Sequence, residues 1–147
     1  MSNKIEDILD EKGVYVSTTV GVSMFPMLRN RRDTIVIKPF IKSGNVRLRK
    51  YDVPLYRRGD DYVLHRIVEV NDTGYIICGD NCLAKEYNIS DEQIIGVLSA
   101  FFRDDKEINM NGVGYRLYCK VWVAMYPLRV IVKKCWFGLK RMVKHVF

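Results

Sequence analysis

Residues 21–28 read Gly21-Val22-Ser23-Met24-Phe25-Pro26-Met27-Leu28 and mark a break in regular structure. The preceding residues 14–20 are β-branched and aromatic, which favours a strand, and Pro26 ends any regular ladder because it has no N–H. The apolar side chains around Ser23 would be costly to leave in water, so we expect some of them to pack beneath the turn. Such packing would hold the Ser23 hydroxyl in one orientation, facing a cleft. The commoner alternative is a buried turn serine without a chemical role.

On both sides of this turn the sequence predicts short elements at close intervals. Residues 5–12 have helical spacing, and Gly13 stands where a helix would stop. The predicted strands are residues 14–20, 34–37, 51–56, 62–70, 75–78 and 94–102. Pro54 favours an edge position for the third of them, because proline cannot donate to a central ladder. The pattern predicts a mainly β fold of coiled, antiparallel sheets with a short leading helix.

The apolar period becomes helical from Tyr115 onwards, so we divide the chain into a β domain of residues 1–114 and a helical tail of residues 115–147. Pro127 separates two apolar stripes, and basic residues lie opposite the second stripe. A basic amphipathic helix with tryptophan on its apolar face is typical of helices that lie on an anionic bilayer. The alternative is a helix that packs onto the body or onto a second copy.

The charge of the chain points to the same end of the molecule. The formal net charge is +7, and the tail contains eight Lys or Arg and no Asp or Glu. This asymmetry predicts an acidic partner for the tail, either lipid headgroups or nucleic acid. The predicted leading helix is too short for a helix-turn-helix, so we expect an anionic membrane surface and no nucleic acid.

Cysteine and histidine usage argues against a metal site. The four cysteines lack paired metal-ligand spacing, and the only histidines are His65 and His145, so we expect neither zinc nor a cofactor. The first residues lack the apolar core of a signal peptide, and no run reaches the roughly 18 apolar residues of a spanning helix. We therefore expect a cytoplasmic protein with free thiols, peripheral at the membrane if the tail binds lipid.

A catalytic Ser23 would need a base within hydrogen-bond reach, because a serine hydroxyl is a weak nucleophile at neutral pH. His65 is the only histidine of the β domain, and apolar neighbours on its strand face would keep it neutral near pH 7. Asp80 follows the strand predicted to pair with that of His65 and could orient the imidazole. Each residue also has a structural alternative: a half-buried histidine on a strand and an aspartate in a tight turn.

Several short motifs occur in an order that resembles type I signal peptidases over residues 13–102. These motifs are Gly21-x-Ser23-Met24-x-Pro26-x-Leu28, Asp33, Tyr51-Asp52-Val53, His65-Arg66, Gly79-Asp80-Asn81 and Ile95-Gly96-Val97. The superfamily includes the self-cleaving domains of SOS-type repressors, and most members use a lysine base. Here His65 stands at the lysine position, as in the endoplasmic-reticulum-type and spore-former branch.

The resemblance implies an irregular, barrel-like signal-peptidase or repressor-peptidase fold and a serine endopeptidase activity on peptide or protein substrates. It implies Ser23 as nucleophile, His65 as general base and Asp80 as the third member, with Gly21, Met24 and Pro26 beside the substrate. The histidine branch carries a second acid several residues later, so Glu86 and Asp91 are alternatives to Asp80. Signal peptidases also carry a membrane-spanning anchor, and this sequence contains no such segment.

Two other functions fit the same sequence. A non-catalytic β module could bind an extended peptide beside its strands. A regulator that cleaves itself, as in the repressor branch, is less favoured because the sequence shows neither DNA-binding helices nor an obvious flexible linker before Ser23.

Overall fold

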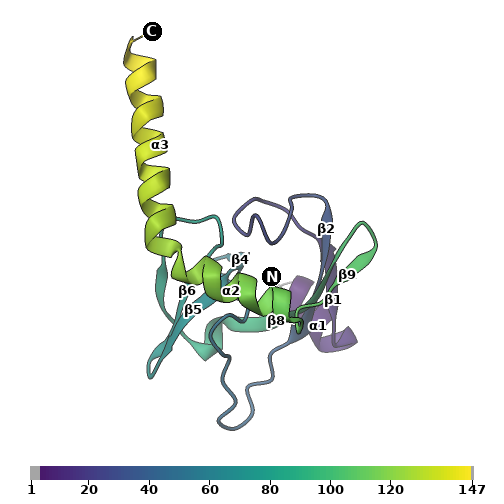
Figure 1. Ribbon diagram of the computed structural model, residues 1–147. Coiled ribbons are helices and arrows are strands. Elements are labelled where there is room, and N and C mark those ends of the chain that lie inside the picture. The colour runs from purple at the N-terminus through teal and green to yellow at the C-terminus, as the bar shows by residue number, and fades with distance from the viewer. Residues whose placement is uncertain (1–3, 147) are drawn as a thin grey trace.

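The computed structural model describes residues 4–146, which form two antiparallel β-sheets, a leading helix and two C-terminal helices (Figure 1). The helices are α1 (Lys4–Lys12), α2 (Val113–Ala124) and α3 (Tyr126–Val146), with a short 3₁₀ turn at Asp91–Gln93. The strands are β1 (Tyr15–Thr18), β2 (Asp33–Pro39), β3 (Pro54–Arg58), β4 (Asp61–Leu64), β5 (Arg66–Asn71), β6 (Gly74–Cys78), β7 (Glu86–Ile89), β8 (Ile94–Arg103) and β9 (Lys106–Ile108).

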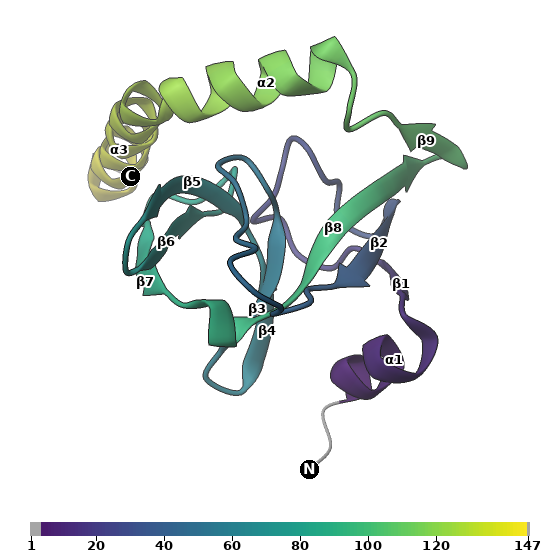
Figure 2. The ribbon, with the colours of Figure 1, turned by 90° about the horizontal axis from the view of Figure 1, so that it is seen from below.

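The larger sheet has the strand order β1-β2-β8-β3-β4, with β9 paired to β8, and the smaller sheet has the order β5-β6-β7. Both sheets are strongly curved, and they lie next to each other along the body (Figure 2). The mainly β fold with coiled antiparallel sheets and a short leading helix is therefore confirmed. Strands β7 and β9, both short, were not predicted from the sequence.

The predicted single strand at residues 62–70 is wrong, because the chain passes from one sheet to the other at His65. Strand β4 ends at Leu64 in the larger sheet, and β5 begins at Arg66 in the smaller one. Leu64 packs against the core of the larger sheet, whereas Ile67 is buried in that of the smaller sheet. His65 therefore lies at the junction of the two sheets.

The predicted edge position of Pro54 is also wrong. Strand β3 lies between β8 and β4, inside the larger sheet. Pro54 is its first residue and stands opposite Val97 in the β3–β8 register. The first position of a strand tolerates a proline even in the interior of a sheet.

The turn around Ser23 is supported from below by the core of the larger sheet. Met24, Met27 and Leu28 are buried there together with Leu9 of α1, which confirms the expected packing beneath the turn. Phe25 is the exception, with 50% of its surface exposed. The buried apolar residues that follow Ser23 thus fix the backbone there, whereas Val22 before it is exposed.

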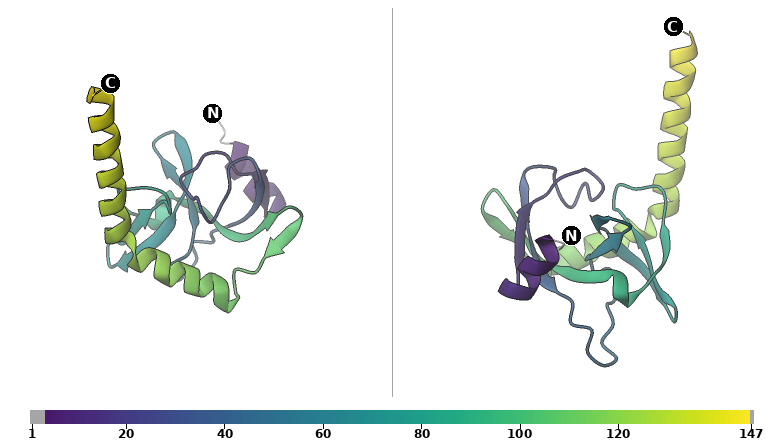
Figure 3. Two further views of the ribbon diagram at one scale, coloured as in Figure 1. Left: turned by 45° about the horizontal axis from the view of Figure 1, so that its top comes forward. Right: turned by 180° about the vertical axis from the view of Figure 1, so that it is seen from behind.

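The two C-terminal helices differ in how they meet the body. Helix α2 packs on it, with Cys119 buried and Tyr115 and Tyr118 against the core of the larger sheet. Helix α3 buries no residue and extends away from the sheets (Figures 1 and 3). The helical tail was predicted correctly, and its two halves have different environments. Within residues 4–146 no helix combines the length and the apolar character that crossing a membrane requires.

Candidate active site

The turn after β6 holds the Ser23 turn through two hydrogen bonds. The Asn81 backbone N–H donates to the carbonyl oxygen of Ser23 at 2.8 Å, and the Asn81 side-chain amide donates to that of Val22 at 3.1 Å. The Gly79-Asp80-Asn81 motif thus positions the Ser23 motif, although the two lie far apart in the sequence.

His65 is 5% exposed, and its Nδ1 atom faces Glu86. The Nδ1 atom lies 3.3 Å from Glu86 Oε1 and 3.2 Å from the Tyr56 hydroxyl oxygen, and that hydroxyl donates its proton to the same Oε1 at 2.6 Å. Because the Tyr56 hydroxyl gives its proton to Glu86, its oxygen can only accept from Nδ1, which places the imidazole proton on Nδ1 and leaves Nε2 unprotonated. Burial lowers the pKa of His65, although Glu86 opposes this shift. The ring is therefore neutral near pH 7, the form that a general base needs.

The Nε2 side of His65 and the Ser23 turn meet across Gly79. A Cβ atom added to Gly79 would stand 3.0 Å from His65 Nε2, 2.7 Å from the Ser23 carbonyl oxygen and 2.6 Å from Cys82 Sγ. There is no room for such an atom between these groups. The absence of a side chain at residue 79 is what allows the Ser23 turn and the imidazole to approach each other.

Ser23 and His65 line one cleft of about 480 Å³, which is open to the surface. Its walls include Ser17 to Val20 at the end of β1 and Tyr62 to Leu64 of β4. These two strands lie at opposite ends of the order β1-β2-β8-β3-β4, and the sheet curls so that both reach the same cleft. Of the residues expected beside a substrate, Gly21 and Met24 line this cleft, whereas Pro26 lines a separate apolar groove beside α3.

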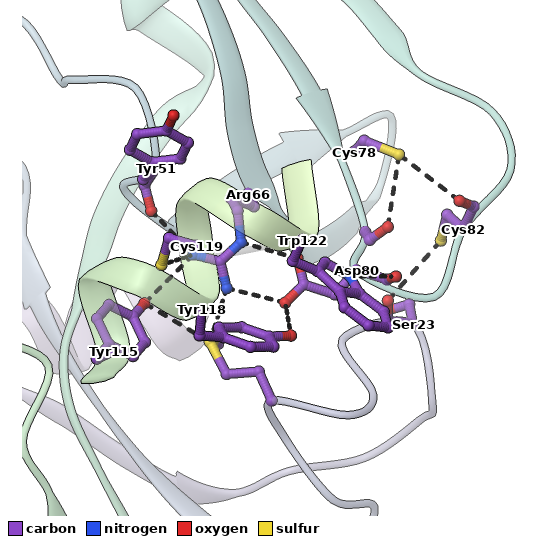
Figure 4. A network of polar contacts seen from close by, with 12 residues as sticks. Ser23, Tyr51, Arg66, Cys78, Asp80, Cys82, Tyr115, Tyr118, Cys119 and Trp122 are labelled. Carbon is purple, nitrogen blue, oxygen red and sulfur yellow. Dashed lines mark hydrogen bonds and ion pairs between the residues drawn. The ribbon is translucent and has the colours of Figure 1, made fainter. Parts of the chain in front are cut away.

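Asp80 does not take the orienting position that we predicted for it, because its carboxylate binds Arg66. Arg66 Nε and Nη2 donate to the two Asp80 oxygens, each at 2.8 Å, and the Tyr118 hydroxyl donates to Oδ2 at 2.8 Å (Figure 4). Arg66 and Asp80 are both buried. Asp91, the other alternative acid, accepts from the Tyr75 hydroxyl and pairs with Arg47. The geometry thus favours Glu86 as the acid beside His65.

Sequence reasoning missed Tyr56 and Cys82 as members of the site. Tyr56 bridges His65 and Glu86, as described above. The Cys82 sulfur lies 4.0 Å from His65 Nε2, and burial raises the pKa of its thiol, which keeps it protonated. A protonated thiol is a poor nucleophile. The position of Cys82 just after the Gly79-Asp80-Asn81 motif is the only sequence signal that could have indicated it.

The C-terminal helices support the Gly79-Asp80-Asn81 turn from outside, which the sequence did not predict. Trp122 Nε1 and Arg129 Nη1 both donate to the Asp80 carbonyl oxygen, at 2.9 and 2.7 Å, and Lys133 Nζ donates to that of Asn81 at 2.5 Å. The tail thus helps to position the Ser23 turn, because it binds the Gly79-Asp80-Asn81 turn that holds the Ser23 turn in place.

The described residues 4–146 contain no group of three or more His, Cys, Asp or Glu side chains placed to hold a metal ion. Comparison of the chain with protein-family models and with curated proteins gave no match.

Proposed function

We propose that the protein is a serine endopeptidase in which Ser23 is the nucleophile, His65 the general base and Glu86 the acid that orients the base. The observation that carries the proposal is the position of His65: Nδ1 faces the Glu86 carboxylate, Nε2 lies beside Gly79 and Cys82, and the ring lines the same cleft as Ser23. A serine triad needs a base with an acid on one ring nitrogen and the nucleophile on the other, and the position of His65 supports these roles, whatever the order of the three residues in the chain.

In the proposed reaction the Ser23 Oγ atom attacks the carbonyl carbon of a peptide bond, and its proton passes to His65 Nε2. Glu86 stabilises the imidazolium that forms. The backbone N–H of Ser23 would donate to the oxyanion. The imidazolium then gives its proton to the leaving amine, and water hydrolyses the resulting ester with His65 acting as base again.

The walls of the cleft favour an extended peptide as substrate. Strands β1 and β4 are the outer strands of the larger sheet, so each has backbone groups on one side that are not used within that sheet. An extended chain can pair with such an edge, and main-chain hydrogen bonds would then supply affinity without a strict sequence requirement. The resemblance to type I signal peptidases adds an expected preference for small side chains before the scissile bond.

The same edge strands also support a second candidate, a non-catalytic module that binds an extended peptide. Labelling with a fluorophosphonate probe separates the two candidates, because the probe reacts with an activated serine hydroxyl. We expect covalent modification of Ser23 in the natural chain and none in Ser23→Ala. Ser17→Ala is the matched control, since Ser17 lines the same cleft and its hydroxyl binds only the neighbouring Thr18 carbonyl among the contacts described.

Cys82→Ser is a further control in the labelling experiment. This variant should still be labelled at Ser23, because the protonated thiol has no part in the proposed reaction. An unlabelled natural chain that still binds peptides would favour the non-catalytic module. Loss of labelling in Cys82→Ser would give the thiol a role that the proposal denies it. A clean internal cut in the purified chain, found by mass spectrometry, would instead support self-cleavage.

A further inference from the structure

One side of helix α3 is entirely apolar. At 100° per residue, nine residues fall within an arc of about 140° that contains no polar side chain. They are Leu128, Ile131, Val132, Cys135, Trp136, Leu139, Met142, Val143 and Val146, which we call the apolar face of α3. Such an arc is as wide as the one with which an amphipathic helix usually packs on a protein core.

This apolar face is not covered by the rest of the chain. Helix α3 buries no residue, and Leu139, near the middle of the apolar face, is 55% exposed. Figures 1 and 3 show the helix extending away from both sheets in several views. An apolar surface of this length in water is costly and indicates a partner.

The charges beside the apolar face have one sign. Arg129, Lys133 and Lys140 follow one border of the arc, and Lys134, Arg141 and Lys144 lie on the rest of the helix surface. The helix contains no Asp or Glu. A partner for α3 must therefore offer an apolar interior together with an acidic surface.

The apolar face continues onto the body beside the Ser23 turn. Leu128 and Val132 line an apolar groove of about 290 Å³ together with Phe25, Pro26 and Met125. The hydrogen bonds from Arg129 and Lys133 to the Gly79-Asp80-Asn81 turn fix the first turns of α3 to the body. A surface that accepts α3 would thus also meet the half-exposed Phe25.

We propose that the apolar face of α3 lies in the interface of an anionic bilayer, parallel to the membrane plane. The basic side chains that do not bind the body would lie among the headgroups: Lys134, Lys140, Arg141 and Lys144. Nucleic acid would pair with the basic side but leave the apolar face in water. A second copy of the helix could cover the apolar face, but it would add a second set of basic side chains and no acidic one. An anionic bilayer would bury the apolar face in its acyl region and pair the basic side chains with its headgroups. The inference does not depend on the proposed peptidase activity.

The test compares two substitutions that add the same charge on opposite sides of α3. Leu139→Lys places a lysine within the apolar face, and Phe137→Lys places one on the basic side, where Phe137 is 56% exposed. The 147-residue chain is sedimented with vesicles of phosphatidylcholine alone or mixed equally with phosphatidylglycerol. We expect binding to the mixed vesicles at low salt, weakening at high salt. Leu139→Lys should reduce the affinity about tenfold or more, and Phe137→Lys should keep or increase it.

Three results would overturn the proposal. The natural chain could fail to bind the mixed vesicles at low salt. Leu139→Lys could bind as well as the natural chain, which would indicate attraction by charge alone. Light scattering could show a dimer that Leu139→Lys dissociates and no vesicle binding, which would assign the apolar face to a second copy. Far-ultraviolet circular dichroism of both variants verifies that α3 remains helical.

Discussion

His65 and Glu86 face each other at the junction of the two sheets, with Nδ1 of the imidazole 3.3 Å from Oε1 of the carboxylate. Each residue belongs to a different stretch of the sheets: His65 lies between β4 and β5, and Glu86 begins β7. The adjacent Arg66 points to the opposite side and takes Asp80 as its partner. Two neighbouring residues thus organise two separate networks, one toward the cleft and one toward α2.

Replacement of Glu86 by Gln should impair the base without unfolding the protein. Glu86 raises the pKa of His65 against the effect of burial, so its removal should lower this pKa further and move the acidic limb of the rate profile to lower pH. Loss of imidazolium stabilisation and of the favoured tautomer should lower kcat by roughly 10²- to 10⁴-fold. The measurement is peptide hydrolysis as a function of pH. A profile and rate like those of the natural chain would remove Glu86 from the triad.

Replacement of Asp80 by Asn should act on stability instead. It would leave the Arg66 guanidinium buried without its counter-charge, which costs about 3–5 kcal/mol in comparable buried pairs. Denaturant unfolding should show the loss, while Asp72→Asn, at an exposed turn, should leave the free energy of unfolding nearly unchanged. If Asp80→Asn instead kept its stability and shifted the pH profile of hydrolysis, Asp80 would be the acid that acts on His65.

Replacement of Gly79 by Ala should push the Ser23 turn and the His65 ring apart. The new methyl group would have to displace the Ser23 backbone, the His65 ring or the Cys82 sulfur. We expect hydrolysis to fall by about a hundredfold, as small misplacements of reacting groups do. Gly138→Ala is the control, because nothing lies within 4 Å of a Cβ at that position of α3. Full activity of Gly79→Ala would show that the approach of Ser23 and His65 is not needed.

The acid sensitivity of the protein should follow from the burial of His65. Its pKa is below the ordinary value of about 6.5, so hydrolysis should stay constant through neutral pH and fall only when the pH drops below that value. In the unfolded chain the same ring takes up a proton more readily, so acidification through this range should also destabilise the fold. His65→Gln should reduce this part of the pH dependence of unfolding. An unchanged dependence would contradict the assigned environment of the ring.

The elements with a clear period could be predicted from the sequence, because each buries one face against a single core. The crossing at His65 could not, since β-branched and apolar residues continue through it and only the partners in space reveal two sheets. The acid of the site was ambiguous for a related reason. In an extended chain neighbouring side chains point to opposite sides, and the sequence does not say whether Asp80 lies on the side of His65 or of Arg66.

The edge position predicted from Pro54 failed because the prediction ignored its place at the start of β3, where its missing N–H is tolerated. The two helices of the tail were predictable from their apolar stripes. The different environments of α2 and α3 could not be predicted, because both helices carry an apolar stripe with a tryptophan and the two stripes have the same period.

The most direct measurement for the whole account is the rate at which a fluorophosphonate modifies Ser23 in the natural chain and in His65→Gln, followed by mass spectrometry of the Ser23 peptide. We expect rapid modification of Ser23 in the natural chain and modification at least about a hundredfold slower in the variant. Equal rates in the two proteins, or no modification of Ser23 in either, would contradict it.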